Sequence, residues 1–164
     1  MLLTTAASRL AVRRTFSVVP RRTIITVKDT FYVSNATAIG EGRNGTVKSD
    51  GDVPLSLKLA TPKSIGGKGD GQNPEQLFAM GYASCFLGAL QFVAGTAGKK
   101  DAAANAKIHS SVVLGPAAEM DGFALKVDLK VEGIEDESLI KAAHEFCPYS
   151  RALRHGIEVN VSKA

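Results

Sequence analysis

A nearly all-apolar stretch in the middle of the chain constrains the fold most strongly. Residues 73–93 begin with Asn-Pro-Glu-Gln and continue as LFAMGYASCFLGALQFV. Asn73 at the N-cap, Pro74 at the first helical position and Gln76 at the third form a capping box, which predicts a helix that begins here. Apolar side chains then occupy nearly every face of this helix, so we expect it to be buried on all sides.

The size of the chain limits what can surround such a helix. A chain of 164 residues fits one domain, and a single layer of sheet can hardly enclose the helix. We therefore expect a second subunit to cover what the sheet leaves open. The Gly, Ser and Gln residues within the stretch argue against a membrane helix, which needs roughly 18 uncharged, mainly apolar residues in a row. We expect no membrane insertion.

Short segments in which apolar and polar residues alternate lie on both sides of the helix and predict strands. They are residues 30–39, 53–60, 107–114, 123–132 and 157–161. Residues 137–146 predict a second helix, which Pro148 ends. Strands in hairpins with helices between them indicate an α+β fold with a mainly antiparallel sheet.

The net charge of +4 comes from the first part of the chain. Residues 1–28 contain no Asp or Glu, carry five arginines and are rich in Ser, Thr, Ala and Leu; without those arginines the chain has 15 basic and 16 acidic residues. This composition is typical of a mitochondrial transit peptide, although a disordered basic tail is an alternative. We expect a leader over residues 1–28, a folded domain over 29–164, a location in the mitochondrial matrix and no nucleic-acid partner.

Cys85, within the apolar helix, and Cys147 are the two cysteines of the chain. In a reducing compartment they are better suited to catalytic or redox-cycling roles than to a permanent bridge, although each could also be a buried structural residue. Burial raises the pKa of a thiol, so a reactive Cys85 needs a cation from elsewhere in the chain. A shift of the pKa from about 8.5 to about 6 would raise the thiolate fraction at pH 7 about thirty-fold.

Cys147 stands directly before Pro148, in the run HEFCPYSRAL. Pro148 can serve as the first residue of a new helical turn, with Cys147 at its N-cap. Backbone N–H groups at that position favour a thiolate. A cysteine in a buried helix and a second at a helix junction suit a dithiol that opens and closes.

Two motifs resemble the Ohr/OsmC family, and within it the organic hydroperoxide resistance (Ohr) branch. They are NPEQLFAMGYASCFLGAL at residues 73–90 and CPYS at 147–150. The GRNG turn at 42–45 and LATP at 59–62 match as well, and the likeness covers roughly residues 29–164. The resemblance implies antiparallel sheets wrapped around a long central helix in an intertwined homodimer.

The resemblance also implies a thiol-dependent peroxidase that reduces alkyl, aryl and fatty-acid hydroperoxides to alcohols. Cys85 matches the peroxidatic cysteine, which becomes a sulfenic acid, and Cys147 matches the resolving cysteine, which forms a disulfide with it. Arg43 matches the active-site arginine, and Glu75 matches the acid that holds that arginine in place. The family uses no metal or bound cofactor, and a dithiol of dihydrolipoamide type, such as a lipoylated protein, recycles the disulfide.

The spacing of these residues sets a geometric condition. Glu75 and Cys85 are ten residues apart, which is roughly 15 Å along one straight helix. One arginine side chain cannot easily reach both from the same helix. Either the helix breaks, or Glu75 of one subunit serves Cys85 of the other.

Apolar residues near Cys85 are expected to line the substrate pocket as well as the core. They are Phe78, Met80, Phe86 and Leu87. After CPYS the chain departs from the family pattern, which makes Arg151 and Arg154 rival partners for a thiolate. His144 is interpreted as a surface or base-assisting histidine. The alternative function is a non-catalytic dimer that binds a hydrophobic small molecule, with merely buried cysteines.

Overall fold

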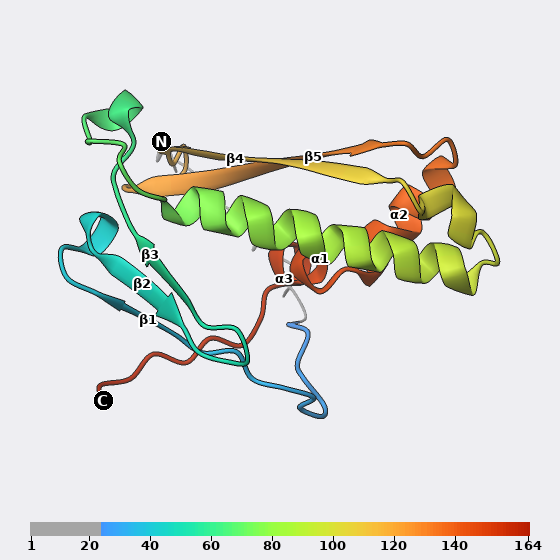
Figure 1. Ribbon diagram of the computed structural model, residues 1–164, viewed down its shortest axis with the longest axis horizontal. Coiled ribbons are helices and arrows are strands. Elements are labelled where there is room, and N and C mark those ends of the chain that lie inside the picture. Colours follow the sequence, from blue (N-terminus) through green and yellow to red (C-terminus); the bar gives the residue numbers. More distant parts are fainter. Residues whose placement is uncertain (1–23) are drawn as a thin grey trace, which may run out of the picture.

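The computed structural model describes residues 24–164, so most of the predicted leader lies outside the described residues. Within this part of the chain, strands, helices and short 3-10 helices alternate in the order shown in Figure 1. The elements are β1 (Ala36–Ile39), η1 (Gly42–Asn44), β2 (Thr46–Ser49), β3 (Leu55–Lys58), η2 (Lys63–Ile65), α1 (Pro74–Thr96), η3 (Lys100–Ala103), β4 (Lys107–Pro116), β5 (Phe123–Glu132), α2 (Glu137–Phe146) and α3 (Pro148–His155).

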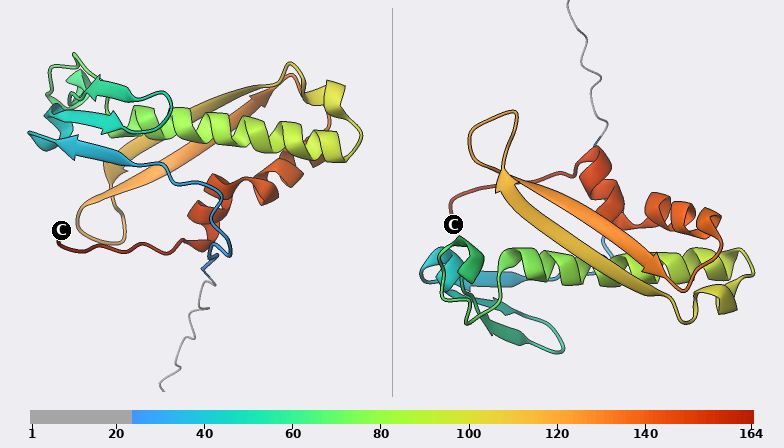
Figure 2. Two further views of the ribbon diagram at one scale, coloured as in Figure 1. Left: turned by 60° about the horizontal axis from the view of Figure 1, so that its bottom comes forward. Right: turned by 90° about the horizontal axis from the view of Figure 1, so that it is seen from above.

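The strands form two antiparallel sheets, as the sequence predicts. β1, β2 and β3 follow one another in a three-stranded sheet, and β4 and β5 form a long hairpin. The hairpin is paired over its full length, from Lys107 opposite Glu132 to Pro116 opposite Phe123. Figures 1 and 2 show the three-stranded sheet at the first turns of α1, while the hairpin crosses the helix and α2 and α3 lie on another side of it.

The predicted capping box is confirmed at the start of α1. The Asn73 side chain accepts from the Gln76 N–H at 2.9 Å, and the Gln76 side chain accepts from the Asn73 N–H at 2.9 Å. Pro74 occupies the first helical position, where a missing N–H costs nothing. α1 continues from there without a break for 23 residues.

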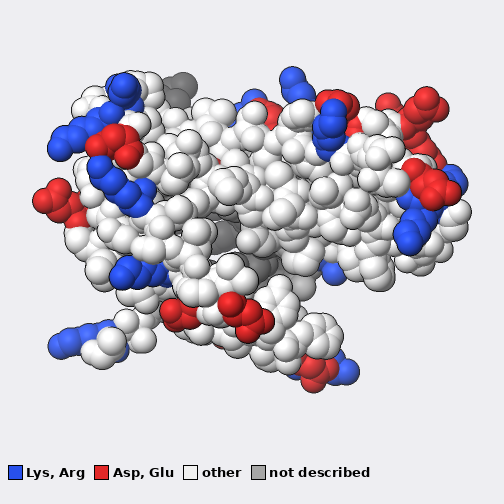
Figure 3. Space-filling model, in the orientation of Figure 1, with Lys and Arg blue, Asp and Glu red and all other residues white. Residues whose placement is uncertain are grey.

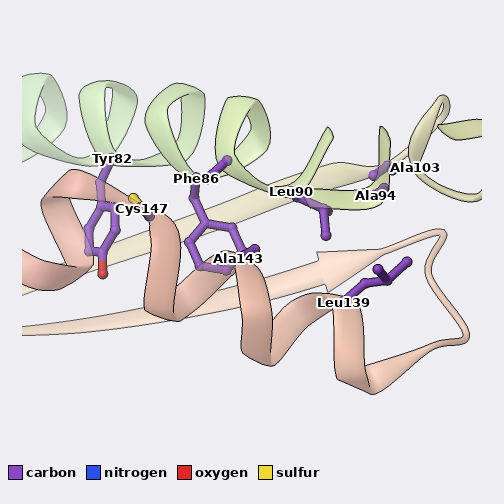
Figure 4. Close-up of a cluster of buried hydrophobic side chains, with 10 residues drawn as sticks. Tyr82, Phe86, Leu90, Ala94, Ala103, Leu139, Ala143 and Cys147 are labelled. Carbon is purple, nitrogen blue, oxygen red and sulfur yellow. The ribbon is translucent and has the colours of Figure 1, made fainter. Parts of the chain in front are cut away.

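The core of the chain lies between α1, the hairpin and α2, and Figure 4 shows its centre. Its buried residues are Tyr82, Phe86, Ala89, Leu90, Ala94, Ala103, Ala106, Leu139, Ala143 and Cys147. Other faces of α1 are open: Met80 is 65% exposed and Phe92 is 57% exposed. The surface over the middle of the molecule in Figure 3 is also largely uncharged. One chain therefore covers α1 only in part.

The length and composition of α1 contradict one expectation about membrane helices. The helix has a window with a mean hydropathy of 1.6, so by length and composition it could cross a membrane. The expectation that its Gly, Ser and Gln residues exclude such a helix was wrong, because none of them carries a charge. The core helix of a soluble protein passes the same test, and the packing of α1 against β4 and α2 favours that interpretation.

The strand predictions were wrong in three places. β1 is shorter than the predicted 30–39, and the four-residue strand β2 was not predicted. The final strand at 157–161 does not form in the described chain, where Val161 is 93% exposed. A strand exists only where a neighbour accepts its backbone hydrogen bonds; β2 has a neighbour on each side, whereas the described chain pairs no strand with 157–161.

The helix predictions after the hairpin were more accurate. α2 has the predicted bounds, from Glu137 to Phe146. The turn predicted after Cys147 is a helix of 8 residues, α3, with Pro148 at its start.

Candidate active site

The two cysteines come from distant parts of the sequence and meet in the core. Cys85 lies in the middle of α1, and Cys147 is fully buried at the junction between α2 and α3. The Cys147 Sγ lies 3.6 Å from the Cys85 Sγ, and both thiols are free. Figure 4 shows the Cys147 sulfur facing α1, between Tyr82 and Phe86. The structure thus places the two predicted redox cysteines in contact.

The junction holds Cys147 by its backbone on both sides. Its N–H donates to the carbonyl of Ala143 at 2.8 Å, which completes the last turn of α2. Its carbonyl accepts from the N–H of Arg151 at 3.0 Å, which begins α3. Pro148 lacks an N–H and suits the first position of the new helix. The cysteine is therefore the cap of two helices at once.

The surroundings of Cys85 in one chain do not activate its thiol. Burial raises the pKa of Cys85, because a thiolate loses hydration in the core; the backbone N–H of Tyr149 lowers it, and the neighbouring Cys147 raises it further. The net direction is upward. The N–H of Tyr149 belongs to the first turn of α3, which helps the thiolate but does not outweigh burial. A reactive Cys85 still needs the cation that the sequence predicts.

Arg43 lies in the tight turn between β1 and β2. Gly42 has a φ of +57°, which a residue with a side chain rarely adopts, and a Cβ on Gly45 would lie 2.1 Å from the carbonyl oxygen of Ile39. The Asn44 side chain accepts from the N–H of Thr61 at 2.9 Å and ties the turn to the end of β3. The glycine-rich sequence of this turn is therefore what allows η1 to present Arg43.

Arg43 and Glu75 form the predicted ion pair. The Arg43 guanidinium donates to the Glu75 carboxylate, which stands in the first turn of α1. This hydrogen bond holds the pKa of Glu75 below its ordinary value of 4.5. The Arg43 Nε is buried, and no atom of residues 24–164 accepts a hydrogen bond from it. The ion pair thus lies at the first turn of α1, with 38% of the Arg43 side chain exposed.

The ion pair and the thiols lie at different places along α1. Arg43 and Glu75 line a cleft of about 390 Å³ with residues of β4, and neither cysteine lines it. α1 does not break between Glu75 and Cys85, so the distance of roughly 15 Å along the helix stands. The structure brings the four predicted catalytic residues together as two pairs rather than one site.

The two rival arginines contact Glu145 rather than the thiols. Arg151 donates from Nε to the carbonyl of Glu145 at 2.7 Å and lies over the ring of Phe146. Arg154 donates to the Glu145 carboxylate at 2.5 Å. Among the described residues, neither forms a hydrogen bond with a cysteine sulfur.

An apolar groove of about 890 Å³ runs between β5, α1 and α2. Phe78 and Phe86, two of the residues predicted to contact substrate, line it. Met80 is exposed instead, and Leu87 packs against the core cluster without lining the groove. Among residues 24–164, no group of three or more His, Cys, Asp or Glu side chains could hold a metal ion.

Two residues of the CPYS motif have roles that the sequence did not reveal. The ring of Tyr149 stacks on that of Phe78 with centroids 6.2 Å apart, and a Cβ on Gly81 would lie 3.3 Å from the Tyr149 hydroxyl. Ser150 is 2% exposed and bonds to two other side chains. The only signal for these roles was the position of both residues in the first turn of a helix that begins at Cys147.

The family is decided by comparison with known proteins. A family model described as OsmC-like protein matches residues 67–162, which is more than half of the chain. The organic hydroperoxide resistance protein of Xanthomonas axonopodis pv. citri is 42% identical over 137 residues, which cover 81% of this chain and 94% of that protein. The chain belongs to the OsmC-like family. The predicted resemblance is therefore confirmed.

Solved structures of the Ohr branch have the same fold. An organic hydroperoxide resistance protein from Legionella pneumophila matches with a TM-score of 0.68 and 39% identity over 79% of this chain and 95% of that chain. A second, from Vibrio cholerae and with captopril bound in one of its active sites, matches with a TM-score of 0.67 and 41% identity over 80% of this chain and 90% of that chain. These relatives place the chain in the Ohr branch of the family and confirm the α+β fold.

Proposed function

We propose that this protein is a thiol-dependent peroxidase that reduces organic hydroperoxides to alcohols. The observation that carries the proposal is the contact between the two free thiols, with 3.6 Å between Cys85 Sγ and Cys147 Sγ. Two cysteines that only fill a core need not place their sulfurs in contact. Here the two sulfurs come from separate elements, α1 and the α2–α3 junction, and still meet. The names of the Xanthomonas and Legionella relatives support organic hydroperoxides as the substrate class.

The reaction proceeds in three steps. The Cys85 thiolate attacks the terminal oxygen of the hydroperoxide, the O–O bond breaks, and Cys85 becomes a sulfenic acid. The leaving alkoxide takes a proton from solvent, which balances the proton that the Cys85 thiol released when it ionised, and departs as the alcohol. The Cys147 thiol then attacks the Cys85 sulfur, so that an S–S bond forms and the hydroxyl leaves as water with the thiol proton. An external dithiol of the dihydrolipoamide type, such as a lipoylated protein, reduces the disulfide and is itself oxidised.

Activation of Cys85 requires the cation that one chain does not bring to it. We infer that the protein is a homodimer in which the Arg43–Glu75 pair of one subunit faces Cys85 of the other. Three features support this arrangement: the unbroken α1, the exposed apolar residues on its open faces, and the Arg43 side chain, of which 38% is exposed in one chain. A thiolate can accept a hydrogen bond from an exposed guanidinium, whose positive charge would lower the pKa that burial raises.

Substrate preference follows from the apolar surroundings of the thiols. Phe78 and Phe86 line the groove beside the turns of α1 that carry Cys85, and we assign the alkyl or aryl part of the substrate to this side. Apolar walls favour binding of a carbon chain, whereas hydrogen peroxide has no apolar part that could bind to them. Met80 and Leu87 remain proposed contacts in the assembled dimer.

The composition of residues 1–28 bears on the compartment in which the protein works. We propose that residues 1–28 direct the folded domain, residues 29–164, to the mitochondrial matrix, on the basis of their arginine-rich and acid-free composition. A matrix location also fits a lipoyl-type reductant. The proposed enzyme uses neither a metal nor a bound cofactor.

The decisive experiment follows consumption of cumene hydroperoxide in the presence of dihydrolipoamide. The wild type should turn over many times, whereas Cys85→Ser should remain at the uncatalysed rate. Cys147→Ser should consume about one equivalent of hydroperoxide and then stop as the sulfenic acid, because the resolving thiol is missing.

Two outcomes would contradict the proposal. Multiple turnovers by Cys85→Ser would show that Cys85 is not the nucleophile. No turnover by the wild type, together with tight binding of an apolar ligand, would favour the non-catalytic binding protein instead.

A further inference from the structure

A small polar cluster lies next to the thiols, inside an otherwise apolar core. Ser150 is the one polar side chain that is fully buried in the described part of the chain, with 2% of it exposed. Its Oγ lies 2.9 Å from the Tyr82 hydroxyl and 3.0 Å from the His144 Nδ1. The three residues belong to α3, α1 and α2, so this Tyr82–Ser150–His144 cluster joins three helices.

The cluster surrounds the Cys147 junction. His144 stands three residues before Cys147, in the last turn of α2, and Ser150 stands three residues after it, in the first turn of α3. Tyr82 stands three residues before Cys85, and residues with this spacing are neighbours on one side of a helix. The two hydrogen bonds of Ser150 therefore connect the junction that carries Cys147 with the turn of α1 that carries Cys85.

The bonds in this cluster are worth more than ordinary surface contacts. A buried hydroxyl without a partner costs about 1–3 kcal/mol, so the buried hydroxyls of Tyr82 and Ser150 need each other, while His144 is only partly buried. Aromatic packing supports the same arrangement: the ring of Tyr82 lies 5.8 Å from that of Tyr149, and the ring of His144 lies 6.4 Å from that of Phe86. A shift of α3 relative to α1 would break these contacts together.

We propose that Tyr82, Ser150 and His144 are positioning residues that hold Cys147 where it can close the disulfide with Cys85. The inference rests on the proposed function, and it concerns the second chemical step alone. The sulfurs must approach from 3.6 Å to about 2.05 Å. A displacement of the junction by about 1 Å in the wrong direction can slow such a step as much as a hundred-fold.

The step itself is balanced without a further reactant. The S–O bond of the Cys85 sulfenic acid breaks and the S–S bond forms, while the hydroxyl and the Cys147 thiol proton leave as water. The preceding attack on the hydroperoxide uses Cys85 and does not need Cys147. Loss of the cluster should therefore slow disulfide closure and leave the first step nearly intact.

The test is a single-turnover reaction of full-length Ser150→Ala with cumene hydroperoxide and no added dithiol. The loss of hydroperoxide reports the first step, and dimedone labelling with a count of remaining thiols reports the second. We expect the first rate to stay within about two-fold of the wild type and disulfide closure to slow about ten-fold or more, with dimedone-reactive sulfenic acid accumulating. The matched control is Ser111→Ala, at an exposed position of β4, which should leave both rates unchanged.

A second variant keeps the test decisive if Ser150→Ala fails to fold. Tyr82→Phe retains the ring and its packing but removes one hydrogen bond of the cluster. It should slow closure several-fold while keeping the far-UV spectrum and the melting cooperativity of the wild type. Disulfide closure at the wild-type rate in a folded variant would overturn the proposal, and so would an equal slowing of both steps.

Failure of the inference can be separated from failure of the proposed function. Diamide accepts two electrons and both thiol protons, so it closes a disulfide without a hydroperoxide or a peroxidase. If the wild type does not consume hydroperoxide, the proposed function fails, but slower closure by diamide in Ser150→Ala still supports the positioning role. Equal closure by diamide in the variant and the wild type would reject that role.

Discussion

The two halves of the proposed active site differ in what one chain provides. The thiol half is complete: Cys85 and Cys147 are in contact, and the backbone of the α2–α3 junction holds Cys147 on both sides. The cationic half also forms within one chain, but it lies away from the thiols, because Arg43 pairs with Glu75 at the first turn of α1. An unbroken helix separates the halves.

This difference explains an apparent contradiction in the chemistry. A thiol peroxidase needs an ionised nucleophile, yet burial raises the pKa of Cys85 in one chain. The guanidinium that could reverse this shift belongs to Arg43, whose side chain pairs with Glu75 and remains 38% exposed in one chain. Under the proposed function, a dimer joins the thiol half of one subunit with the cationic half of the other.

The largest expected effect is the recovery of activity from the inactive Cys85→Ser parent when that variant is mixed with Arg43→Ala. Cys85→Ser lacks the nucleophile and Arg43→Ala lacks the cation, and each can be produced with a different affinity tag. In a mixed dimer purified by both tags, one of the two sites has an intact Cys85 and an intact Arg43 if the residues act across the interface. We expect about half of the wild-type activity, since a two-fold dimer contains two equivalent sites.

Two outcomes of this mixing experiment would contradict an active site that is shared between two subunits. Activity at the level of the parent variants would mean that Arg43 acts on Cys85 of its own subunit. Failure of the two tags to co-purify under conditions in which the wild type is active would exclude the dimer.

A smaller effect is expected for the first chemical step in Arg43→Ala alone. Without the guanidinium, the pKa of Cys85 should return toward the high value of a buried thiol, and oxidation of Cys85 at pH 7 should slow about thirty-fold or more. Stopped-flow measurement with cumene hydroperoxide gives this rate, and raising the pH should restore part of it. Arg151→Ala is the matched control, because Arg151 contacts Glu145 instead; a comparable loss in that variant would transfer the activating role to Arg151.

The smallest effect concerns the Arg43–Glu75 pair and stability. The pKa of Glu75 is lowered in the folded protein, so the ionised carboxylate stabilises the fold above its ordinary value of 4.5 and this contribution is lost as the pH falls below that value. Arg43 is 38% exposed and solvent screens the pair, so we expect about 1 kcal/mol or less.

Urea unfolding of Glu75→Gln between pH 3 and pH 7 measures this contribution. The variant should be less stable than the wild type near neutral pH, and the difference should shrink as the pH falls below 4.5 and through the lowered pKa of Glu75. Glu135→Gln, which removes an exposed carboxylate, corrects for the loss of one charge. A difference that stays constant with pH would mean that the ion pair does not stabilise the fold.

Local sequence patterns predicted the helices with little error. The capping box at Asn73 and Gln76 placed the start of α1, and α2 has the predicted bounds, because caps and periodicity act within a few residues. The strands were predicted less accurately. β2 was missed and the strand at 157–161 does not form in the described chain, since a strand depends on neighbours that are distant in sequence.

The sequence by itself determined the two candidate reactive cysteines, the long apolar helix and, through its resemblance to the Ohr branch, the family. Tertiary structure decided which groups meet. The 3.6 Å contact between the thiols joins positions 62 residues apart, and Ser150 gained its partners only when three helices packed together. The separation of Arg43 from Cys85 also follows from packing, because a continuous helix keeps two of its turns at a constant distance.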